Sequence, residues 1–269
     1  MATRATGAPP RLPAVFVSHG SPMAAVEPGP AGAAWAALGR EAGRPRAILV
    51  ASAHWETEVP MLTGAAAPKT IHDFGGFPDA LYALRYPAPG APDVAAEAAA
   101  LLRDAGIAAG IDGCRGLDHG AWVPLLHMFP RADVPVVQLS IQPARGAAHH
   151  VALGRAIAPL AARGVLVVGS GHVTHNLRDW MAHRRDPAPL PYVARFATWL
   201  AEALAANDAE ALAHWRERAP DAARAHPTDE HFLPVLVAWG AGGEGAAGAR
   251  VHAGIEGAAL AMDAYRFAA

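Results

Sequence analysis

Short, almost wholly apolar segments alternate with helical segments along the chain, and this alternation limits the folds that it can adopt. Residues 14–18 (AVFVS), 46–52 (RAILVAS) and 165–170 (VLVVGS) have the length of strands and few polar side chains. Such runs are typical of parallel strands that helices cover on both faces. Segments with helical character lie between the strands, at 33–41, 93–104, 118–129, 149–162 and 191–207. The pattern predicts an α/β fold with a mostly parallel central sheet flanked by helices.

The extent of the chain fits one domain. It has 269 residues, of which 52% are hydrophobic, and this is enough for one large core. No change in composition marks an internal boundary, so we expect a single domain over residues 13–269. The glycine-rich segment 240–248 is expected to be a flexible link before the closing strands. Residues 1–12 have no apolar stretch of signal-peptide length, and we expect them to form a short disordered lead-in.

Charge and cysteine usage exclude several classes of protein. The formal net charge of −2 gives no electrostatic footprint for nucleic acid or for an anionic membrane. No window of about 18 consecutive apolar residues is present, so we expect no membrane-spanning helix. Cys114 is the single cysteine, which excludes an intrachain disulfide and a thiolate-rich zinc site and suits a reducing cytoplasm. Any metal must therefore be held by histidines and carboxylates.

Several of the fourteen histidines follow predicted strands, namely His19, His54, His172 and His175. In open α/β sheets, ligands bind beyond the carboxyl ends of the strands, so these side chains are expected to converge. Imidazole binds divalent metals, and its pKa lets it carry protons near neutral pH. The placement predicts a metal site with proton-transfer groups beside it, although each histidine taken alone also fits a simple strand cap.

Two further histidines lie next to acidic residues. His231 follows Asp229 and Glu230 at an expected helix start. The alternative is that both carboxylates only complement the helix dipole and that His231 is interior. His119 follows Asp118, and a carboxylate beside a histidine can orient its ring and raise its basicity.

The segment 69–90 is long, has little periodicity and is rich in Gly, Pro and aromatic residues, which is typical of a functional loop. His72 and Asp73 lie in this segment. They can border a pocket together with the aromatic residues nearby, Phe74, Phe77 and Tyr82. Packing explains these aromatic side chains equally well.

Six short motifs occur in order along the chain. They are HGSPM at 19–23, SAHW at 52–55, IHDF with GFP at 71–78, GLDHGAW at 116–122, GSGxxxHNL at 169–177 and EHFLP at 230–234. With this ordered combination, the chain resembles the class III extradiol ring-cleavage dioxygenases, in the branch similar to DOPA 4,5-dioxygenase. The resemblance implies that residues 13–269 form an extradiol dioxygenase-like catalytic domain with one divalent metal ion.

The resemblance also assigns roles to individual histidines. The metal ligands of the family match His19, His54, His231 and, as a ligand or an acid–base group, His175. Proton transfer falls to His175, and the histidine matching His119 lines the substrate site as a second catalytic group. His172 occupies a variable position of its motif and therefore ranks below His175.

The metal set of this branch differs from the arrangement of the wider superfamily. That superfamily uses two histidines and a carboxylate to hold iron(II). Here His231 stands where the carboxylate is expected, and Glu230 lies next to it. A neutral set of histidines suits zinc as well as iron(II). We expect Zn²⁺ in the purified protein and Fe²⁺ to support turnover.

The activity that the resemblance implies is opening of the ring of a catechol-type, DOPA-like substrate with O2. A small aromatic diol would bind in the site, where Phe74, Phe77 and Trp122 are candidates for stacking on its ring. His175 would accept a phenolic proton, and His119 would stabilise oxygen or donate a proton. Two alternatives stay open at this point, a zinc-dependent hydrolase on the same histidine site and a non-enzymatic metal-binding relative of the superfamily.

Overall fold

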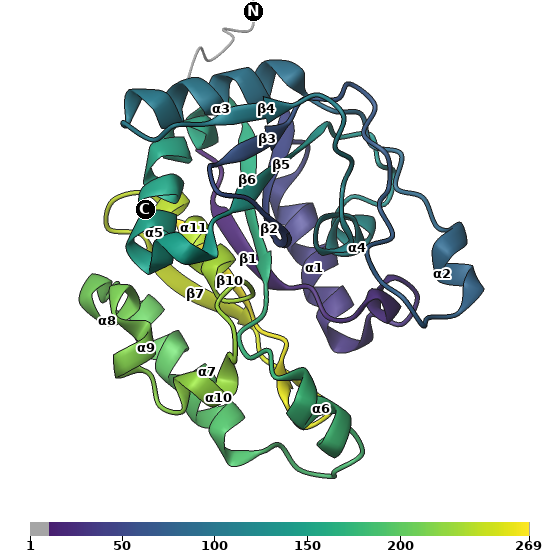
Figure 1. The fold of residues 1–269 in the computed structure, drawn as a ribbon, viewed down its shortest axis with the longest axis vertical. Helices are drawn as coiled ribbons and strands as arrows, with labels where there is room; N and C mark the ends of the chain where they lie inside the picture. The colour runs from purple at the N-terminus through teal and green to yellow at the C-terminus, as the bar shows by residue number, and fades with distance from the viewer. Residues whose placement is uncertain (1–10, 269) are drawn as a thin grey trace, which may run out of the picture.

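The computed structural model describes residues 11–268, and within them one large sheet has eight strands in the order β4-β3-β5-β2-β6-β1-β10-β7 (Figure 1). Its strands are β1 (Ala14–Ser18), β2 (Ala47–Glu56), β3 (Met61–Thr63), β4 (Gly110–Asp112), β5 (Val136–Ile141), β6 (Val165–Gly171), β7 (Ala247–His252) and β10 (Ala264–Ala268). A separate small hairpin pairs β8 (Ile255–Glu256) with β9 (Leu260–Ala261).

The centre of the large sheet is parallel, and antiparallel pairs lie toward its edges. Strand β6 pairs in parallel with both β1 and β2, and β2 also pairs in parallel with β5. Strand β10 runs antiparallel to β1 and to β7, and β3 runs antiparallel to β5. The predicted α/β fold with a mostly parallel sheet is therefore confirmed. The parallel centre places the carboxyl ends of β1, β2 and β6 side by side.

Helices cover both faces of this sheet. The helices of the described chain are α1 (Gly29–Ala42), α2 (Asp79–Ala83), α3 (Pro92–Asp104), α4 (His119–Met128), α5 (Gly146–Ile157), α6 (Leu177–His183), α7 (Pro191–Ala205), α8 (Ala209–Ala213), α9 (Trp215–Arg218), α10 (Ala222–Ala225) and α11 (Leu233–Gly242). Short 3-10 helices are η1 (Pro22–Ala25), η2 (Pro143–Arg145) and η3 (Ala158–Arg163). In Figure 1, α5 and α11 lie to the left of the sheet, and α1 and α4 lie to its right.

Successive strand residues point to opposite faces, and both faces are buried because the strands are apolar throughout. Phe16 and Leu49 pack in the core that includes α3, α5, α7 and α11. Their neighbours Val17 and Val50 pack in the second core, with α1 and α4. The unbroken apolar runs of the sequence thus correspond to strands between two helical layers.

Helix α11 is buried along its whole length, from Leu233 to Gly242. A helix that is apolar on every side must lie in a protein interior, and α11 contacts α5, β6 and β1. It extends into the segment 240–248 that the sequence predicts to be a flexible link, and strand β7 begins at Ala247. Only residues 243–246 therefore remain as a link between the helix and the strand. The helix continues through its glycines because burial of the helix end outweighs the helix-breaking tendency of glycine.

The predicted lead-in falls mostly outside the described part of the chain. Residues 1–10 lie outside it, whereas Arg11 and Leu12 are described. The Arg11 guanidinium donates hydrogen bonds to the carbonyl oxygens of Ala241 and Gly242, at 3.2 and 3.0 Å. Within residues 11–268, no helix has the length and apolar character that crossing a bilayer requires.

Candidate metal centre

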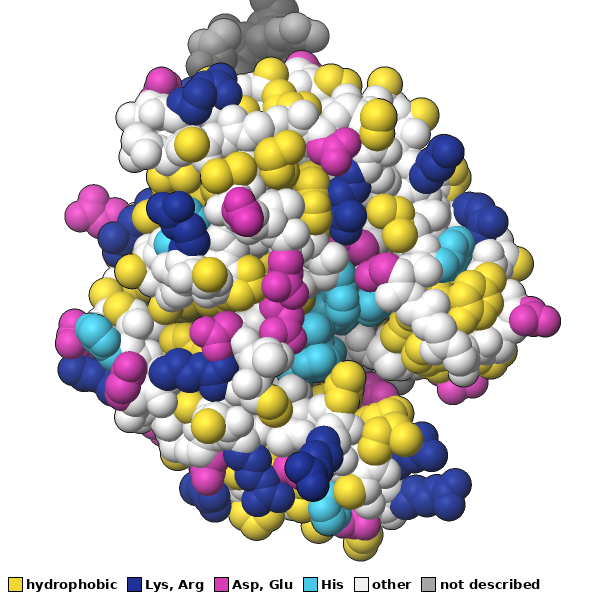
Figure 2. Space-filling model, in the orientation of Figure 1, with side chains coloured by type: hydrophobic (Ala, Val, Ile, Leu, Met, Phe, Trp, Pro, Cys, Tyr) yellow, Lys and Arg dark blue, Asp and Glu magenta, His cyan; other side chains and the backbone are white. Residues whose placement is uncertain are grey.

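The parallel strands bring three distant histidines together. His19 directly follows β1, His54 lies near the carboxyl end of β2, and His231 lies in the turn before α11. Because β1 and β2 both pair with β6, their carboxyl ends meet at one edge of the sheet. Figure 2 shows histidine side chains gathered in a hollow near the middle of one face of the molecule.

A close backbone approach lets the turn with His231 reach the end of β6. The His172 N–H donates to the His231 carbonyl oxygen at 2.8 Å. A Cβ atom at Gly171 would lie 2.2 Å from the same oxygen. Glycine at this position therefore allows His231 to approach the strand ends, which no larger residue permits without displacing the turn.

One ring nitrogen of each of His19, His54 and His231 lies within 4.8 Å of the other two. The Nε2 atoms of His19 and His54 are 3.1 Å apart. Such a separation fits a hydrogen bond between the two rings in the absence of a metal, and it also brings both nitrogens close enough to face a common cation. The three side chains can therefore share one divalent metal ion.

A serine fixes the tautomer of His19. The Ser170 hydroxyl donates its proton to the carbonyl oxygen of Gly120, and it lies 3.0 Å from Nδ1 of His19. With its proton committed, this hydroxyl accepts from Nδ1–H, which leaves the lone pair of His19 on Nε2. The sequence does not single out Ser170, although it lies in the GSG segment at the end of β6, beside β1.

Glu230 fixes the tautomer of His231 in a similar way. Its carboxylate accepts from Nδ1–H of His231 at 2.8 Å, so the lone pair of this ring is on Nε2 as well. That Nε2 atom is buried and has no hydrogen-bond partner among residues 11–268. A buried nitrogen lone pair without a partner is costly, and a metal ion would satisfy it.

Burial keeps the imidazoles of this cluster neutral. It lowers the pKa of His19 and of His231 well below the ordinary value, and the neighbouring histidines lower both further. Burial and His119 lower the pKa of His54 to about 3, against the opposing charge of Asp73. Neutral rings with free lone pairs are the form that binds metal, so the residues present fit a divalent cation.

His175 lies beside this cluster. Its ring stacks on that of His231, with centroids 3.4 Å apart and an interplanar angle of 13°. The grouping of potential ligand atoms joins His175 with Glu230 and His231, rather than with His19 and His54. Burial lowers the pKa of His175 to about 3, with smaller effects from neighbouring histidines. The ring is thus a neutral group that can accept a proton next to the metal position.

His172 binds the backbone next to His19. Its Nε2 accepts a hydrogen bond from the backbone N–H of Gly20 at 3.1 Å. This bond uses the lone pair that a metal would need, and it holds the turn that follows His19. Gly20 has a φ of 70°, a left-handed conformation that glycine adopts without strain. His172 therefore supports the centre from outside.

His119 is oriented by Asp73 and not by its neighbour Asp118, so the expected role of Asp118 is wrong. Asp118 caps α4 by accepting from Ala121 N–H, and it also accepts from the Ser52 hydroxyl at 2.7 Å. These bonds turn its carboxylate away from the adjacent ring. Asp73 instead accepts from Nδ1–H of His119 at 2.9 Å.

Asp73 is ionised under ordinary conditions. Burial alone raises the pKa of its carboxyl group, but hydrogen bonds and charge from His119 outweigh burial and lower the pKa to about 2.

The aromatic residues expected at the substrate site divide into two groups. Trp122 is fully buried, and its indole N–H donates to the Ile71 carbonyl oxygen at 2.9 Å. It therefore cannot stack on a substrate, and that expectation is wrong. Phe74 and Phe77 are partly buried and contact each other edge to face, and Phe74 also contacts the His119 ring, with centroids 5.7 Å apart.

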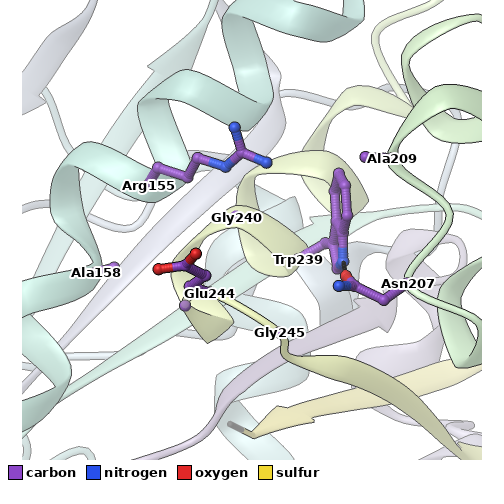
Figure 3. A pocket seen from close by; sticks show the side chains of 9 residues that line it. Arg155, Ala158, Asn207, Ala209, Trp239, Gly240, Glu244 and Gly245 are labelled. Atoms are coloured by element: carbon purple, nitrogen blue, oxygen red, sulfur yellow. Dashed lines mark hydrogen bonds between the residues drawn. The ribbon is translucent and has the colours of Figure 1, made fainter.

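A separate cavity of about 500 Å³ lies away from these histidines (Figure 3). Its lining includes Arg155, Asn207, Trp239 and Glu244, and none of the candidate site residues. The Trp239 indole N–H donates to the Asn207 side chain at 2.8 Å.

Comparison with known proteins agrees with this geometry. Residues 13–261 match the family of the catalytic LigB subunit of aromatic ring-opening dioxygenase. A Beta vulgaris protein named 4,5-DOPA dioxygenase extradiol is 41% identical, over 94% of this chain and 95% of that protein. An Escherichia coli K12 protein of the same name is 40% identical, over 86% of this chain and 85% of that protein.

A solved structure described as an uncharacterized protein of Escherichia coli K12 has the same fold. The TM-score is 0.77 at 32% sequence identity, and the match covers 95% of this chain and 99% of that one.

These findings define a metal-dependent enzyme that acts on an aromatic substrate and O2. The chain belongs to the LigB family, and it is an extradiol aromatic ring-opening dioxygenase. The names of the relatives support ring opening over the zinc hydrolase and the non-enzymatic binding protein that the sequence left open.

Proposed function

We propose that the enzyme opens the ring of a small DOPA-like catechol at the histidine cluster beyond β1, β2 and β6. The observation that carries this proposal is the convergence of His19, His54 and His231, whose ring nitrogens lie within 4.8 Å of one another. Hydrogen bonds to Ser170 and Glu230 leave two of these rings with the lone pair on Nε2.

His19, His54 and His231 are proposed to hold one divalent metal per chain. A bound cation would supply Lewis-acid activation of a phenolic oxygen and, as iron(II), a route for electrons from the catechol to O2. Three neutral imidazoles suit zinc and iron(II) alike, so we propose Zn²⁺ in the purified protein and Fe²⁺ for turnover. Binding of either metal requires no proton loss near neutral pH, because burial already keeps these histidines neutral.

His175 is proposed to accept a proton from the catechol. Its ring is neutral and lies against His231, so a substrate hydroxyl near the metal position is within its reach. Glu230 lies 3.9 Å from Nδ1 of His175, where its negative charge would stabilise the imidazolium that results. This arrangement favours His175 as an acid–base group rather than as a fourth ligand.

His119 is proposed to act on the opposite side of the substrate. Its ring lies 3.9 Å from that of His54 between centroids, and Phe74 contacts its edge. A ring in this place can hold or transfer a proton at the oxygen side of the reacting ring. The aromatic surface of Phe74 and Phe77 next to it suits a planar substrate.

The DOPA-like class of substrate is supported by the relatives, several of which are named 4,5-DOPA dioxygenase extradiol. A panel of catechols tests it directly. Protein reconstituted with iron(II) in air should convert a catechol with an amino-acid or similar side chain into a yellow ring-fission product. Absence of turnover across the panel, with iron bound, would refute the proposed substrate class.

A further inference from the structure

We propose that Asp73 is the positioning residue that holds the ring of His119 in one orientation and one tautomer for the reaction. The assignment rests on the proposed role of His119, and it concerns a carboxylate more than forty residues away in the sequence. One oxygen of Asp73 accepts from the His119 backbone N–H at 2.9 Å. The other accepts from Nδ1–H of the His119 ring, also at 2.9 Å.

These two bonds determine where the proton of His119 lies. An ionised carboxylate can only accept, so Nδ1 of the neutral ring must carry the hydrogen. The lone pair is then on Nε2, and this atom makes no hydrogen bond within residues 11–268. Only 7% of the His119 side chain is exposed, and its ring lies beside the proposed ligands, with centroids 3.9 Å from His54 and 5.5 Å from His19. His119 thus presents an acceptor to a substrate proton.

Residues on both sides of Asp73 contact the segment 117–122. The Ile71 N–H donates to the Leu117 carbonyl oxygen at 2.8 Å, and the Ile71 carbonyl accepts from the buried Trp122 indole at 2.9 Å. The next residue, Phe74, packs against the Trp122 ring. The loop is therefore pinned to the start of α4, and Asp73 does not depend on a mobile segment for its position.

Asp73 also lies near His54, at 3.7 Å from Nδ1, which is longer than a hydrogen bond. Both carboxylate oxygens are already engaged with His119. We therefore assign Asp73 to His119, and not to the metal ligand or to a metal ion held by His54, Asp73 and His119 together.

The test compares Asp73→Asn with Asp79→Asn, the same removal of charge from an exposed residue nearby in the sequence, at the start of α2. Asparagine keeps an oxygen for the His119 backbone N–H, but its amide can donate to Nδ1 and so favours the opposite tautomer. Removing the carboxylate partner of a catalytic histidine in this way has cost about 10⁴-fold in kcat in a serine protease. For this more exposed pair we expect a fall of about 10²-fold, at nearly unchanged KM.

A spectroscopic readout separates positioning from simple destabilisation. ¹⁵N NMR of the zinc-loaded protein, with the His119 signals identified by their loss in His119→Gln, should show the Nδ1–H tautomer in wild type and in Asp79→Asn. Asp73→Asn should show Nε2–H with metal content unchanged. An unchanged tautomer, or a loss of bound metal that indicates a role through His54, would overturn the proposal. Absence of catechol turnover in wild type would instead refute the proposed function, and the NMR result would still decide on Asp73.

Discussion

At the scale of single residues, two of the three imidazoles proposed as ligands are held on the side away from the proposed metal position. Ser170 binds Nδ1 of His19, and Glu230 binds Nδ1 of His231. Such outer partners select the tautomer and direct the Nε2 lone pair inward. Burial then keeps the rings neutral, so the centre is prepared for a metal before one binds.

Substitution should separate ligands from acid–base groups. His54→Ala removes one of three converging nitrogens, so bound metal should fall well below one per chain. His175→Ala leaves all three in place, and it should retain metal and fold while turnover falls by about 10²-fold or more. Metal analysis together with oxygen uptake checks both. Unchanged stoichiometry in His54→Ala would contradict its role as a ligand, and wild-type turnover by His175→Ala would contradict its role in proton transfer.

Much of the centre could be predicted from the sequence at this scale, and the remainder could not. His19, His54 and His175 could be found because strand ends converge in an α/β sheet, whichever strands are neighbours. The hydrogen-bond partners of the His19 and His119 rings, Ser170 and Asp73, come from segments far away in the sequence, and no local pattern indicates such a pairing. Asp118 was misassigned because a residue that begins a helix turns its carboxylate toward the helix backbone.

At the scale of elements, the close contact of α5 with α11 supports the core behind the centre. A Cβ atom at Gly154 would lie 2.2 Å from the Val237 carbonyl oxygen, and one at Gly240 would lie 2.5 Å from the Val151 carbonyl oxygen. Small residues on both helices thus let their backbones touch. The sequence pattern showed two apolar helical segments but not this contact, because it depends on which faces meet.

Gly154→Ala tests the contact of these helices. Alanine favours an isolated helix by about 1 kcal/mol relative to glycine. Here the added methyl group meets backbone that cannot rotate away, so the free energy of unfolding should fall by about 1–3 kcal/mol. Urea denaturation measures this change. Gly113→Ala, outside the helices at a site with no atom within 4 Å of the added group, controls for the added methyl group alone and should change stability little. Equal or higher stability of Gly154→Ala would contradict the packing described.

At the scale of the whole molecule, histidines outside the centre make stability depend on pH. Burial lowers the pKa of His226 to about 3 and that of His150 to about 4. In the unfolded chain both titrate near 6.5, so below that pH the unfolded state binds more protons than the folded state. The free energy of unfolding should therefore be highest above about pH 6.5 and should fall as the pH decreases. At pH 5 it should be lower by about 2 kcal/mol per histidine.

Denaturation of the chelator-treated protein between about pH 8 and about pH 5 measures this loss together with that of the buried histidines of the centre, whose pKa values are also lowered. His150→Gln removes one of the buried histidines that titrate on unfolding and should reduce the pH dependence, whereas replacement of the exposed His214 should not. Stability that rises toward low pH would contradict the burial of neutral histidines.

The overall architecture was the part most accessible from the sequence. Unbroken apolar runs predicted a sheet covered on both faces, and the two cores confirm it. Strand order could not be predicted, because β1, β2 and β6 meet through crossovers that leave no local pattern. Their adjacency is nevertheless what gathers His19, His54 and His231 at one edge.

Dependence of catechol turnover on O2 tests the central claim most directly, namely that this histidine centre opens an aromatic ring. Iron(II)-loaded protein should consume one O2 for each catechol that is converted to the yellow product. Formation of the yellow product should stop completely under anaerobic conditions and resume when air is admitted. Product formation that continues without O2, as zinc-dependent hydrolysis would, contradicts the account.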